Sequence, residues 1–430
     1  MGHKRHSLLY IAYHFPPLGG VATLRSLKNV KYLAQLGYKV QVLTVRTALI
    51  RRPKDHALLA EIPSSVKVWR AFCPDISWLF KLLWGLKLNT LVQFIQQRLL
   101  IPDAEVLWRP FAKRKLRRII RRHPEIRAAV ISSGPPSSLA LGLMIKNRYH
   151  IPFICDFRDE WTNNPERINQ AYPAASQSRE LLMEAKVVSA AAGLVYLTKR
   201  MRDNFLSSYP FLDTKPSAII PNGFAEEDFA GLEATSDRQV FHLVYSGSFY
   251  GRRQPDPLWR AVLGLIEAGR IDPDKLRVEI QGKNTPAFVL GQYNGHPTLQ
   301  KIVCFQPFVS HSQSLKTLMR ATALLLYIPS GKNAGSVLTG KIFDYLRSGK
   351  PILAIVPPGG MAAELVIKAG TGLVADCSDQ QGISDKLLKL YQLWQDGDIE
   401  RLQADQDFIS AFSREKLAQA LADLIDEVAQ

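Results

Sequence analysis

The stretch SLLYIAYHFPPLGGV, residues 7–21, joins a short apolar run to a turn rich in proline and glycine. The apolar run, residues 8–13, has the length of a strand that is buried on both faces. In residues 22–36 leucine, valine and alanine recur at helical spacing, and Gly37 ends the pattern. A buried strand, a glycine turn and a helix form the repeating unit of α/β sheets.

The same alternation fills both halves of the chain. Strands are predicted at residues 8–13, 40–45, 66–71, 128–132, 153–156, 193–197, 218–220, 241–246, 278–281, 302–305, 323–327, 351–356 and 372–374. Helices are predicted at residues 22–36, 258–268, 383–391 and 399–429. Buried runs separated by helices indicate parallel sheets. We therefore predict an α/β fold with two Rossmann-like domains that face each other across a cleft.

A polar, acidic stretch separates the two halves. We predict a first domain over residues 1–224, a linker over 225–238 and a second domain over 239–398. Residues 399–430 are predicted to form C-terminal helices, which could cross back to the first domain. Ligands in such sheets bind beyond the carboxyl ends of the strands, so the loops after strands are where site residues are expected.

The positive charge of the chain is concentrated in its first third. The net charge is +17, and residues 1–127 contain 24 Lys or Arg against 6 Asp or Glu. The remaining 303 residues contain 31 basic and 32 acidic side chains. Such asymmetry indicates an anionic partner, namely a membrane surface, a nucleic acid or a polyanionic substrate.

One helical segment carries much of this charge. Its basic residues are Lys113, Arg114, Arg117, Arg118, Arg121 and Arg122. Leu116, Ile119 and Ile120 form a narrow apolar stripe between them, and aromatic residues such as Trp78 and Trp84 lie upstream. This pattern favours a helix that lies on anionic lipid. A solvated basic face is the simpler alternative, and no nucleic-acid partner is expected because no stacking module accompanies the charge.

Neither a membrane span nor a secretion signal is predicted. The most apolar region, residues 76–101, is interrupted by Lys81, Lys87, Asn89 and Arg98, whereas a spanning helix needs about 20 mostly apolar residues. The N-terminal apolar run is short and lacks a cleavage site. The 4 cysteines show neither disulfide nor zinc spacing, which fits a reducing compartment. We expect a cytoplasmic protein that associates peripherally with the membrane.

Two loops of the first half carry chemistry. In residues 14–21, His14 precedes Gly19 and Gly20, and paired glycines before a helix suit close approach to phosphate. In residues 155–162, Arg158, Asp159 and Trp161 follow a strand and suit recognition of sugar hydroxyls or acid–base work. The simpler alternatives are a tight turn in the first loop and a salt-bridge network around Arg158 in the second.

Two loops of the second half mirror them. Gly247 opens a glycine loop that contains Arg252 and Arg253, and Lys283 follows a later strand, so cations could neutralise a diphosphate. Gly335 and Ser336 precede a helix on which Lys341 and Asp344 lie three residues apart, near one face. A carboxylate there could hold a ribose diol. An exposed basic turn and an ordinary ion-paired helix are the alternatives.

Taken in order, these motifs resemble the GT-B glycosyltransferases of the family-4-like group of retaining sugar transferases. The matching pieces are residues 13–21, Arg25-Ser26, residues 101–103, Trp108, and residues 132–137, 156–162, 220–223, 245–248, 341–346 and 349–351. Residues 156–162, DFRDEWT, are the most recognisable piece of this subgroup. Each piece alone is moderately specific, and the ordered set covers most of the chain.

The resemblance implies a site for a nucleotide-diphosphate sugar in the second half. There Arg252, Arg253 and Lys283 would face the diphosphate beside Gly247, Gly335, Ser336 and Lys341, and Asp344 would bind ribose. Gly19 and Gly20 would approach the donor phosphate from the first half. That half would bind a lipid-linked or polysaccharide acceptor through His14, Arg158 and Trp161, with Asp159 as a catalytic group. Arg253, Lys283 and Lys341 would be catalytic too, and neither a metal nor a cofactor would be required.

The sequence departs from the family at two points. The pair of glutamates seven residues apart reads here as Ser336 and Asp344, and a histidine common after a first-half strand is replaced within residues 133–136. Two alternatives therefore stay open beside the transferase. One is a nucleotide-sugar epimerase of the same fold, and the other is a catalytically degenerate membrane or assembly scaffold.

Overall fold

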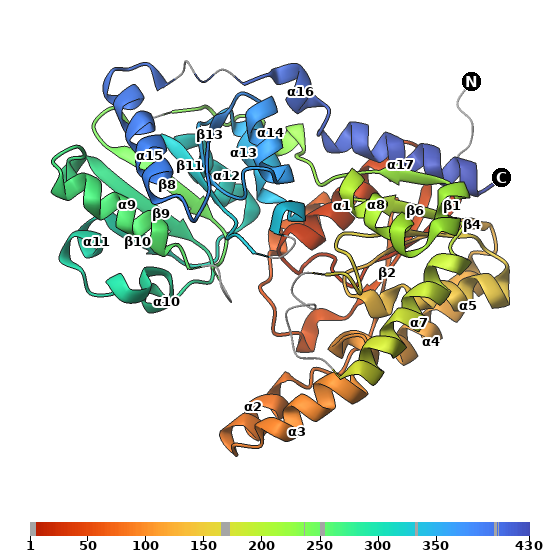
Figure 1. The fold of residues 1–430 in the computed structure, drawn as a ribbon. Helices are drawn as coiled ribbons and strands as arrows, with labels where there is room; N and C mark the ends of the chain where they lie inside the picture. Colours follow the sequence, from red (N-terminus) through yellow and green to blue (C-terminus); the bar gives the residue numbers. More distant parts are fainter. Residues whose placement is uncertain are drawn as a thin grey trace. The chain divides into compact units, whose positions relative to one another are not determined.

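The computed structural model describes residues 6–164, 173–235, 237–249, 254–331, 334–399, 402 and 404–430. It divides into two compact units (Figure 1). The first comprises Met1–Asn222 and Arg414–Gln430, and the second comprises Gly223–Ser413. Each unit is built on one parallel sheet, with seven strands in the first and six in the second. The predicted α/β class with two Rossmann-like domains is confirmed.

The sheet of the first unit has the strand order β3-β2-β1-β4-β5-β6-β7. Its strands are β1 Ser7–Ile11, β2 Lys39–Val45, β3 Lys67–Ala71, β4 Ile126–Ser132, β5 Phe153–Asp156, β6 Gly193–Tyr196 and β7 Ser217–Ile219. Its helices are α1 Val21–Gln35, α2 Ser77–Gly85, α3 Asn89–Phe94, α4 Arg109–Arg122, α5 Ala140–Tyr149, α7 Ala174–Ala190, α8 Lys199–Ser208 and α17 Arg414–Val428. The order reverses direction at β1 and β4, where doubly wound sheets bind ligands.

Alternate side chains of β1 bury on opposite faces of this sheet. Leu8 and Tyr10 pack with α1 and α17 on one face. Leu9 and Ile11 pack on the other face with residues of α4, α5, α7 and α8. Because both faces are covered, the strands are continuous apolar runs, which explains why they were readable in the sequence.

The second unit repeats this plan with the strand order β10-β9-β8-β11-β12-β13. Its strands are β8 Phe241–Ser246, β9 Leu276–Gln281, β10 Val303–Gln306, β11 Ala323–Tyr327, β12 Ile352–Ile355 and β13 Gly372–Ala375. Its helices are α9 Asp256–Glu267, α10 Pro286–Leu290, α11 Pro297–Ile302, α12 His311–Arg320, α13 Lys341–Ser348, α14 Met361–Lys368, α15 Gln380–Gln395 and α16 Gln406–Ser410. One face packs on α9 and α15, and the other packs on α12, α13 and α14.

The C-terminal tail, predicted as helices over residues 399–430, forms α16 in the second unit and α17 in the first. Asp405 caps the start of α16 by accepting a hydrogen bond from the Phe408 backbone, and this helix ends at Ser410. The stretch predicted as a linker contains the short helix η7 Glu226–Phe229, and Phe229 is buried in the core of the second unit.

A buried ion pair crosses the interior of the first unit. Arg25 of α1 donates to both carboxylate oxygens of Asp156, at the end of β5, with a shortest N–O distance of 2.6 Å. Its other donors reach the backbone carbonyls of Ile220 and Pro221, just after β7, at 3.0 and 2.8 Å. Both side chains are 1% exposed. One guanidinium therefore ties α1 to the carboxyl ends of two strands.

Removing one partner of this pair should strongly destabilise the first unit. Asp156→Asn and Arg25→Met each leave a buried polar group without its counterpart, and we expect losses of about 3–5 kcal/mol in urea unfolding. The double variant Arg25→Met/Asp156→Leu should lose less than either single variant, because it leaves no buried charge. Losses no larger than that of an exposed substitution such as Lys186→Met would contradict the assigned role.

Candidate functional site

The loops after β8 and β9 in the second unit are tied together. The side chain of Asn284 accepts a hydrogen bond from the Phe249 backbone at 2.7 Å and donates one to the Gly247 carbonyl at 2.9 Å. The Lys283 backbone donates to the Ser248 hydroxyl at 3.0 Å. These bonds hold two glycine turns side by side at the carboxyl edge of the sheet. Sequence reasoning named Gly247 and Lys283 but missed Asn284, which joins them.

Lys341 comes to the same place from the start of α13. Its ammonium lies 3.7 Å from the centre of the Tyr245 ring, a cation–π contact. Gly247 has a φ of 146°, and a Cβ on it would lie 2.3 Å from the Lys341 ammonium. Below them the Ser246 backbone donates to the Tyr345 hydroxyl at 2.9 Å, which fixes α13 against β8. The glycine thus makes room for a cation over the loop.

Asp344, one turn along α13 from Lys341, faces a histidine. His311, the first residue of α12, lies with Nε2 3.2 Å from one Asp344 oxygen and Nδ1 3.7 Å from an Asp228 oxygen. The side chains of all three are partly buried. His311 was missed because single histidines are usually structural. Its place directly after Ser310, which caps a helix that follows a strand, was the available signal.

The other predicted donor residues divide into three cases. The Lys283 side chain is exposed, with no hydrogen bond or ion pair from its ammonium to the residues that the structure describes. Gly335 and Ser336 lie in the short helix η10 Ala334–Ser336, whose residues are partly exposed. Arg252 and Arg253 lie outside the described residues. The described part of the chain therefore gathers Gly247, Lys283, Lys341 and Asp344 on loops at the carboxyl edge of the second sheet and on the first turn of α13.

In the first unit, the loop after β1 is held by the loop that follows β2. Gly19 donates through its backbone to the Pro53 carbonyl at 2.9 Å, and Leu18 forms a bridge with Lys54. Gly20 precedes α1 with a φ of 99° and caps it without a side-chain hydrogen bond. The predicted glycine turn is therefore real, and its backbone conformation is one that glycine adopts without strain.

His14 of this loop lies near two guanidinium groups. Burial lowers the pKa of His14 well below its ordinary value, and the charges of Arg158 and Arg52 lower it further. The Arg52 guanidinium lies 3.5 Å from His14 Nε2 and also pairs with Glu105. His14 is therefore a neutral ring between two cations, a setting that suits a hydrogen-bonding role toward an anionic or hydroxylated ligand.

Arg158 is placed by the loop after β4. Its backbone donates to the Ser133 hydroxyl at 2.9 Å, and a Cβ on Gly134 would lie only 1.9 Å from its guanidinium. Gly134 therefore leaves the space that the guanidinium occupies. The Arg158 Nε is buried and has no hydrogen-bond partner among the described residues. Asp156 of this loop is bound by Arg25, and the charges of Asp159 and Asp156 also act on the Arg158 guanidinium, so a salt-bridge network around Arg158 stays an alternative.

Two other predicted residues of this loop differ in exposure. Asp159 is exposed. Trp161 is 1% exposed and belongs to the apolar core of the first unit. An indole that is buried in the core offers no face to a sugar, so we assign Trp161 to packing instead of to acceptor binding.

A pocket of about 600 Å³ lies in the first unit near the root of α2. The side chains that give it polar or aromatic character are Arg51, Arg52, Lys54, Asp75 and Trp78. The pocket combines three cations with one carboxylate and an indole, which suits a ligand that carries negative charge and an apolar or sugar surface. No motif in the sequence pointed to it.

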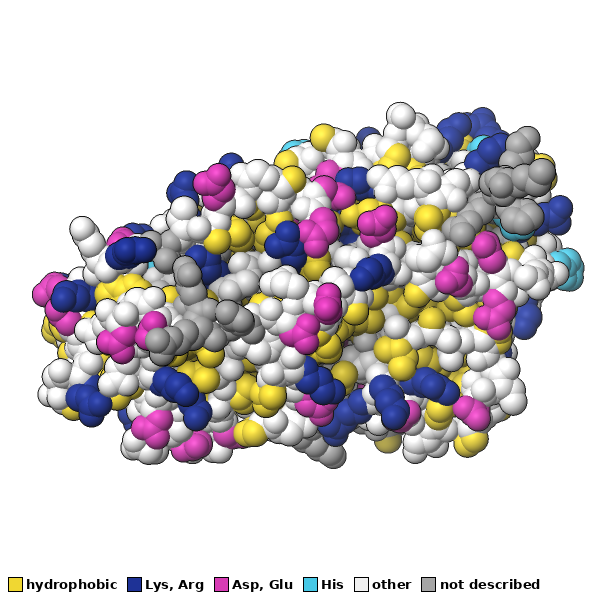
Figure 2. Space-filling view, turned by 90° about the horizontal axis from the view of Figure 1, so that it is seen from above, with side chains coloured by type: hydrophobic (Ala, Val, Ile, Leu, Met, Phe, Trp, Pro, Cys, Tyr) yellow, Lys and Arg dark blue, Asp and Glu magenta, His cyan; other side chains and the backbone are white. Residues whose placement is uncertain are grey.

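The predicted basic helix is α4. Its apolar stripe, Leu116, Ile119 and Ile120, is buried, and the helix packs against β2 and β3. This stripe is therefore not available to lipid, contrary to the interpretation of α4 as an amphipathic membrane helix. Arg114, Arg117, Arg118, Arg121 and Arg122 are exposed, and Lys113 is partly exposed. On the face shown in Figure 2, by contrast, basic side chains are interspersed with acidic ones.

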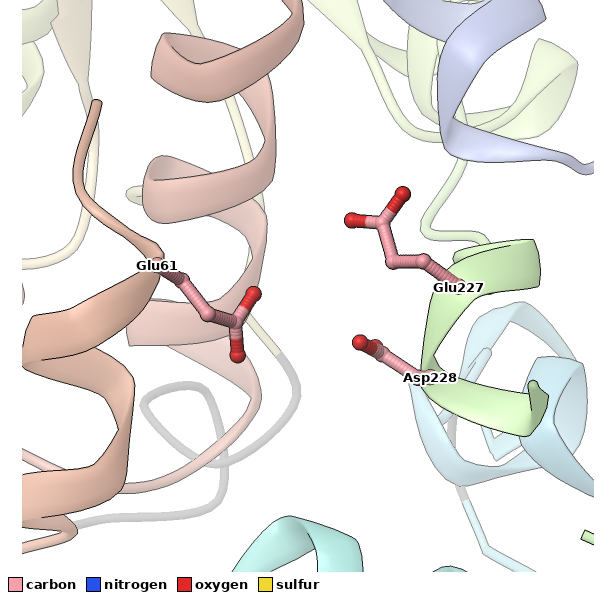
Figure 3. Close-up of side chains that lie close together, drawn as sticks. All are labelled: Glu61, Glu227 and Asp228. Atoms are coloured by element: carbon pink, nitrogen blue, oxygen red, sulfur yellow. The ribbon is translucent and has the colours of Figure 1, made fainter. Parts of the chain in front are cut away.

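Figure 3 shows three acidic side chains, Glu61 at the end of helix η2 His56–Glu61 and Glu227 and Asp228 in η7. Glu61 pairs with the buried Lys28 at 2.6 Å within the first unit. Asp228 lies near His311 within the second unit, as described above. Glu61 and Asp228 are thus engaged inside their own units, and we assign no metal site to these three side chains.

This chain is similar to known glycosyltransferases in part of its sequence and in its fold. Residues 26–228 match the family described as Glycosyltransferase Family 4. The fold resembles that of sucrose-phosphate synthase from Thermosynechococcus elongatus, with 14% identity, a TM-score of 0.67 and coverage of 98% of this chain and 99% of that one. It also resembles WaaG, a glycosyltransferase involved in lipopolysaccharide biosynthesis (15% identity, TM-score 0.59, coverage 97% and 99%). A third structure is S. aureus TarM (9% identity, TM-score 0.61, coverage 98% and 100%).

No curated protein matched the sequence. Identities this low show the fold alone, and that fold, with one Rossmann-like sheet in each of two units, is GT-B. The family match spans residues 26–228, most of the first unit, and together with the GT-B fold it indicates a glycosyltransferase similar to family 4, a class of enzymes that transfer a sugar from a nucleotide sugar.

Gly247→Ala should disturb the second unit's site locally. The new methyl group would displace the Lys341 ammonium, and alanine would be strained at the φ of residue 247. We therefore expect a loss of about 1 kcal/mol in stability and weaker binding of a nucleoside diphosphate. Gly264→Ala is the matched control, because no atom lies within 4 Å of its Cβ and it sits inside α9. Calorimetric titration of both variants checks this, and equal affinities would contradict it.

The depressed pKa of His14 should make the first unit less stable in acid. The unfolded chain takes up a proton near pH 6.5 and the folded one does not, so stability falls as pH drops below that value, by at most about 1.4 kcal/mol per pH unit. Urea unfolding at pH 7.5 and 5.5 should show a smaller loss for His14→Gln than for the natural chain. The exposed His150→Asn is the control, and identical losses in all three would refute the assignment.

Proposed function

We propose that this glycosyltransferase takes its sugar from a nucleotide-diphosphate donor, retains the anomeric configuration and transfers the sugar to a lipid-linked or polysaccharide acceptor at the cytoplasmic face of a membrane. The observation that carries the donor part is the convergence of Gly247, Lys283 and Lys341 at the carboxyl edge of the second sheet. Two lysines and a glycine turn at a strand end suit a diphosphate.

Cations at this edge would act on the leaving group. Sugar transfer breaks the bond between the anomeric carbon and the diphosphate oxygen, and negative charge grows on the diphosphate as that bond breaks. The Lys341 ammonium, held over the loop, and the Lys283 ammonium would stabilise this charge without a metal. Arg252 and Arg253 stay predicted partners in the same role. The acceptor hydroxyl oxygen bonds to the anomeric carbon as the bond to the diphosphate breaks, and its proton would pass to the carboxylate of Asp159.

Asp344 would hold the ribose of the donor nucleotide. A carboxylate accepts hydrogen bonds from a diol, and His311, at 3.2 Å, would orient it. The family's pair of glutamates is represented here by Ser336 and Asp344, so one carboxylate would do the work of two. Ser336 and Gly335, together with Gly19 and Gly20, stay predicted donor contacts.

The acceptor would bind to the first unit and would carry negative charge. His14 and Arg158 lie on the loops after β1 and β5 and influence each other electrostatically, and the pocket with Arg51, Arg52 and Lys54 offers further cations. A phosphate or diphosphate on a lipid carrier, or an anionic polysaccharide, has the matching chemistry. Asp159 is the exposed carboxylate of this region and stays the proposed catalytic partner for the acceptor hydroxyl.

Two of the structural neighbours fit this proposal by the chemistry in their names. WaaG is a glycosyltransferase involved in lipopolysaccharide biosynthesis. The TarM structure is a complex with UDP, fondaparinux and alpha-GlcNAc-glycerol. The membrane part of the proposal rests on the basic first third of the chain and on the exposed arginines of α4. Among the described residues no helix is long and apolar enough to cross a membrane.

Lys341→Ala and Lys283→Ala should each lower kcat/KM by about 10²–10³, because each removes a charge that acts on the leaving diphosphate. The nucleotide is identified first by thermal shift with UDP, GDP, ADP, TDP and CMP, since a ligand at about 100 times its Kd stabilises by about 2.7 kcal/mol. Activity is then measured with the sugar nucleotide of the base that binds.

Lys316→Ala, an exposed lysine on α12, is the matched control and should keep full activity. Full activity in the Lys283 and Lys341 variants would overturn the site assignment. An isomerised sugar nucleotide formed from the donor alone would indicate an epimerase instead. A folded protein that binds lipid and none of the five nucleotides would favour a scaffold.

A further inference from the structure

Residues 77–100 of the first unit form a short helical hairpin, which we call the apolar hairpin. It consists of α2, α3 and the single turn η3 Ile95–Leu99. In Figure 1 the hairpin projects away from the sheet of its unit. Six of its large apolar side chains, Trp78, Leu82, Trp84, Leu86, Leu91 and Phe94, are 44–61% exposed. The described part of the chain has no other segment with as many exposed large apolar side chains.

The exposure is not a consequence of poor packing, because the hairpin has a core of its own. Phe80, Val92 and Leu100 are buried, and partly buried side chains such as Leu83 and Ile95 pack against them. The exposed residues therefore form a second apolar face, in addition to the inner one. Exposed large apolar side chains in this number normally meet an apolar surrounding, and for this face the described structure provides none.

Charge points to the nature of that surrounding. Between Asp75 and Asp103 the sequence contains no acidic residue, while Lys81, Lys87 and Arg98 are basic and exposed. The Arg98 guanidinium lies 5.7 Å from the centre of the Phe94 ring. Indole rings, leucines and long basic side chains on one element are typical of a helix at a lipid interface, where the apolar part enters the acyl region and the cations reach the head groups.

The hairpin is too short to span a bilayer. α2 has 9 residues and α3 has 6, whereas a spanning helix needs about 20. We propose that the apolar hairpin inserts its outer face into the interface of an anionic membrane and anchors the first unit there, with α4 adding only long-range attraction. Trp78 also lines the basic pocket, so insertion would bring that pocket to the head groups, where a lipid-linked acceptor resides. This last clause rests on the proposed function, whereas the anchoring does not.

Vesicle binding tests the anchor directly. The full chain should float with vesicles of phosphatidylcholine and phosphatidylglycerol, and Leu82→Ser/Trp84→Ser/Leu86→Ser should lower its partition at least about tenfold, or 1.4 kcal/mol. The matched control is Leu181→Ser/Leu182→Ser/Ile367→Ser, which removes three equally exposed apolar side chains elsewhere and should bind as the natural chain does. Circular dichroism verifies that both triple variants fold.

The salt dependence of vesicle binding distinguishes the contribution of the hairpin from that of the basic helix α4. Binding through inserted apolar side chains should persist in part at 1 M salt, whereas attraction to α4 alone would be screened over about 3 Å. Arg117→Gln/Arg118→Gln/Arg121→Gln/Arg122→Gln should therefore weaken binding at low salt and leave the salt-resistant part intact. Abolished binding in this variant, with the hairpin variant unaffected, would overturn the proposal.

A second copy of the chain is the other occupant to exclude. Sedimentation of the protein without lipid should give the same mass for the natural chain and the hairpin variant. A dimer that the hairpin variant loses, together with unchanged vesicle binding, would overturn membrane anchoring. Sugar transfer is not measured in any of these experiments, so their failure would leave the proposed donor chemistry standing, and a failed activity assay would leave the anchor standing.

Discussion

The first unit depends on one buried ion pair. Asp156 ends β5 in the middle of the sheet, and Arg25, from the helix after β1, neutralises it and also satisfies two backbone carbonyls that follow β7. In a low dielectric neither charge could stay buried without the other. Because Asp156 immediately precedes Phe157 and Arg158, the pair also sets where the loop after β5 starts, and so where Arg158 meets Gly134 and approaches His14.

In the second unit the loops at the carboxyl edge of the sheet are positioned by other interactions than a buried ion pair. Its loops after β8 and β9 are joined by the amide of Asn284, and the cation beside them rests on an aromatic ring instead of a carboxylate. The Lys341 ammonium lies over Gly247, which leaves space for it because it has no side chain. Asp344 is oriented by His311 a turn away. The first turn of α13 thus presents both a cation and a carboxylate, the groups that binding of diphosphate and ribose would require.

In the basic first third of the chain, the exposed charge and the exposed apolar surface lie on two different elements, α4 and the apolar hairpin. The apolar stripe of α4 covers the sheet, so its arginines form an outward face, while the preceding hairpin carries the apolar side chains that the sheet does not use. An amphipathic pattern in the sequence states only that one face of a helix avoids water. Whether that face meets protein or lipid depends on what the fold places against it.

The sequence by itself determined the class of fold and every strand. Each of the predicted strands is present, and its bounds differ from the prediction by at most two residues. The prediction succeeds because a strand covered on both faces has a sequence that is a short apolar run between turns. It also pointed to Gly247, Lys341 and Asp344 through their order after strands. Only the tertiary structure decided that Trp161 is a core residue, that His311 meets Asp344 and that the stripe of α4 is buried. These facts are contacts between residues distant in the chain, and local periodicity contains no information about which distant side chain fills a given space.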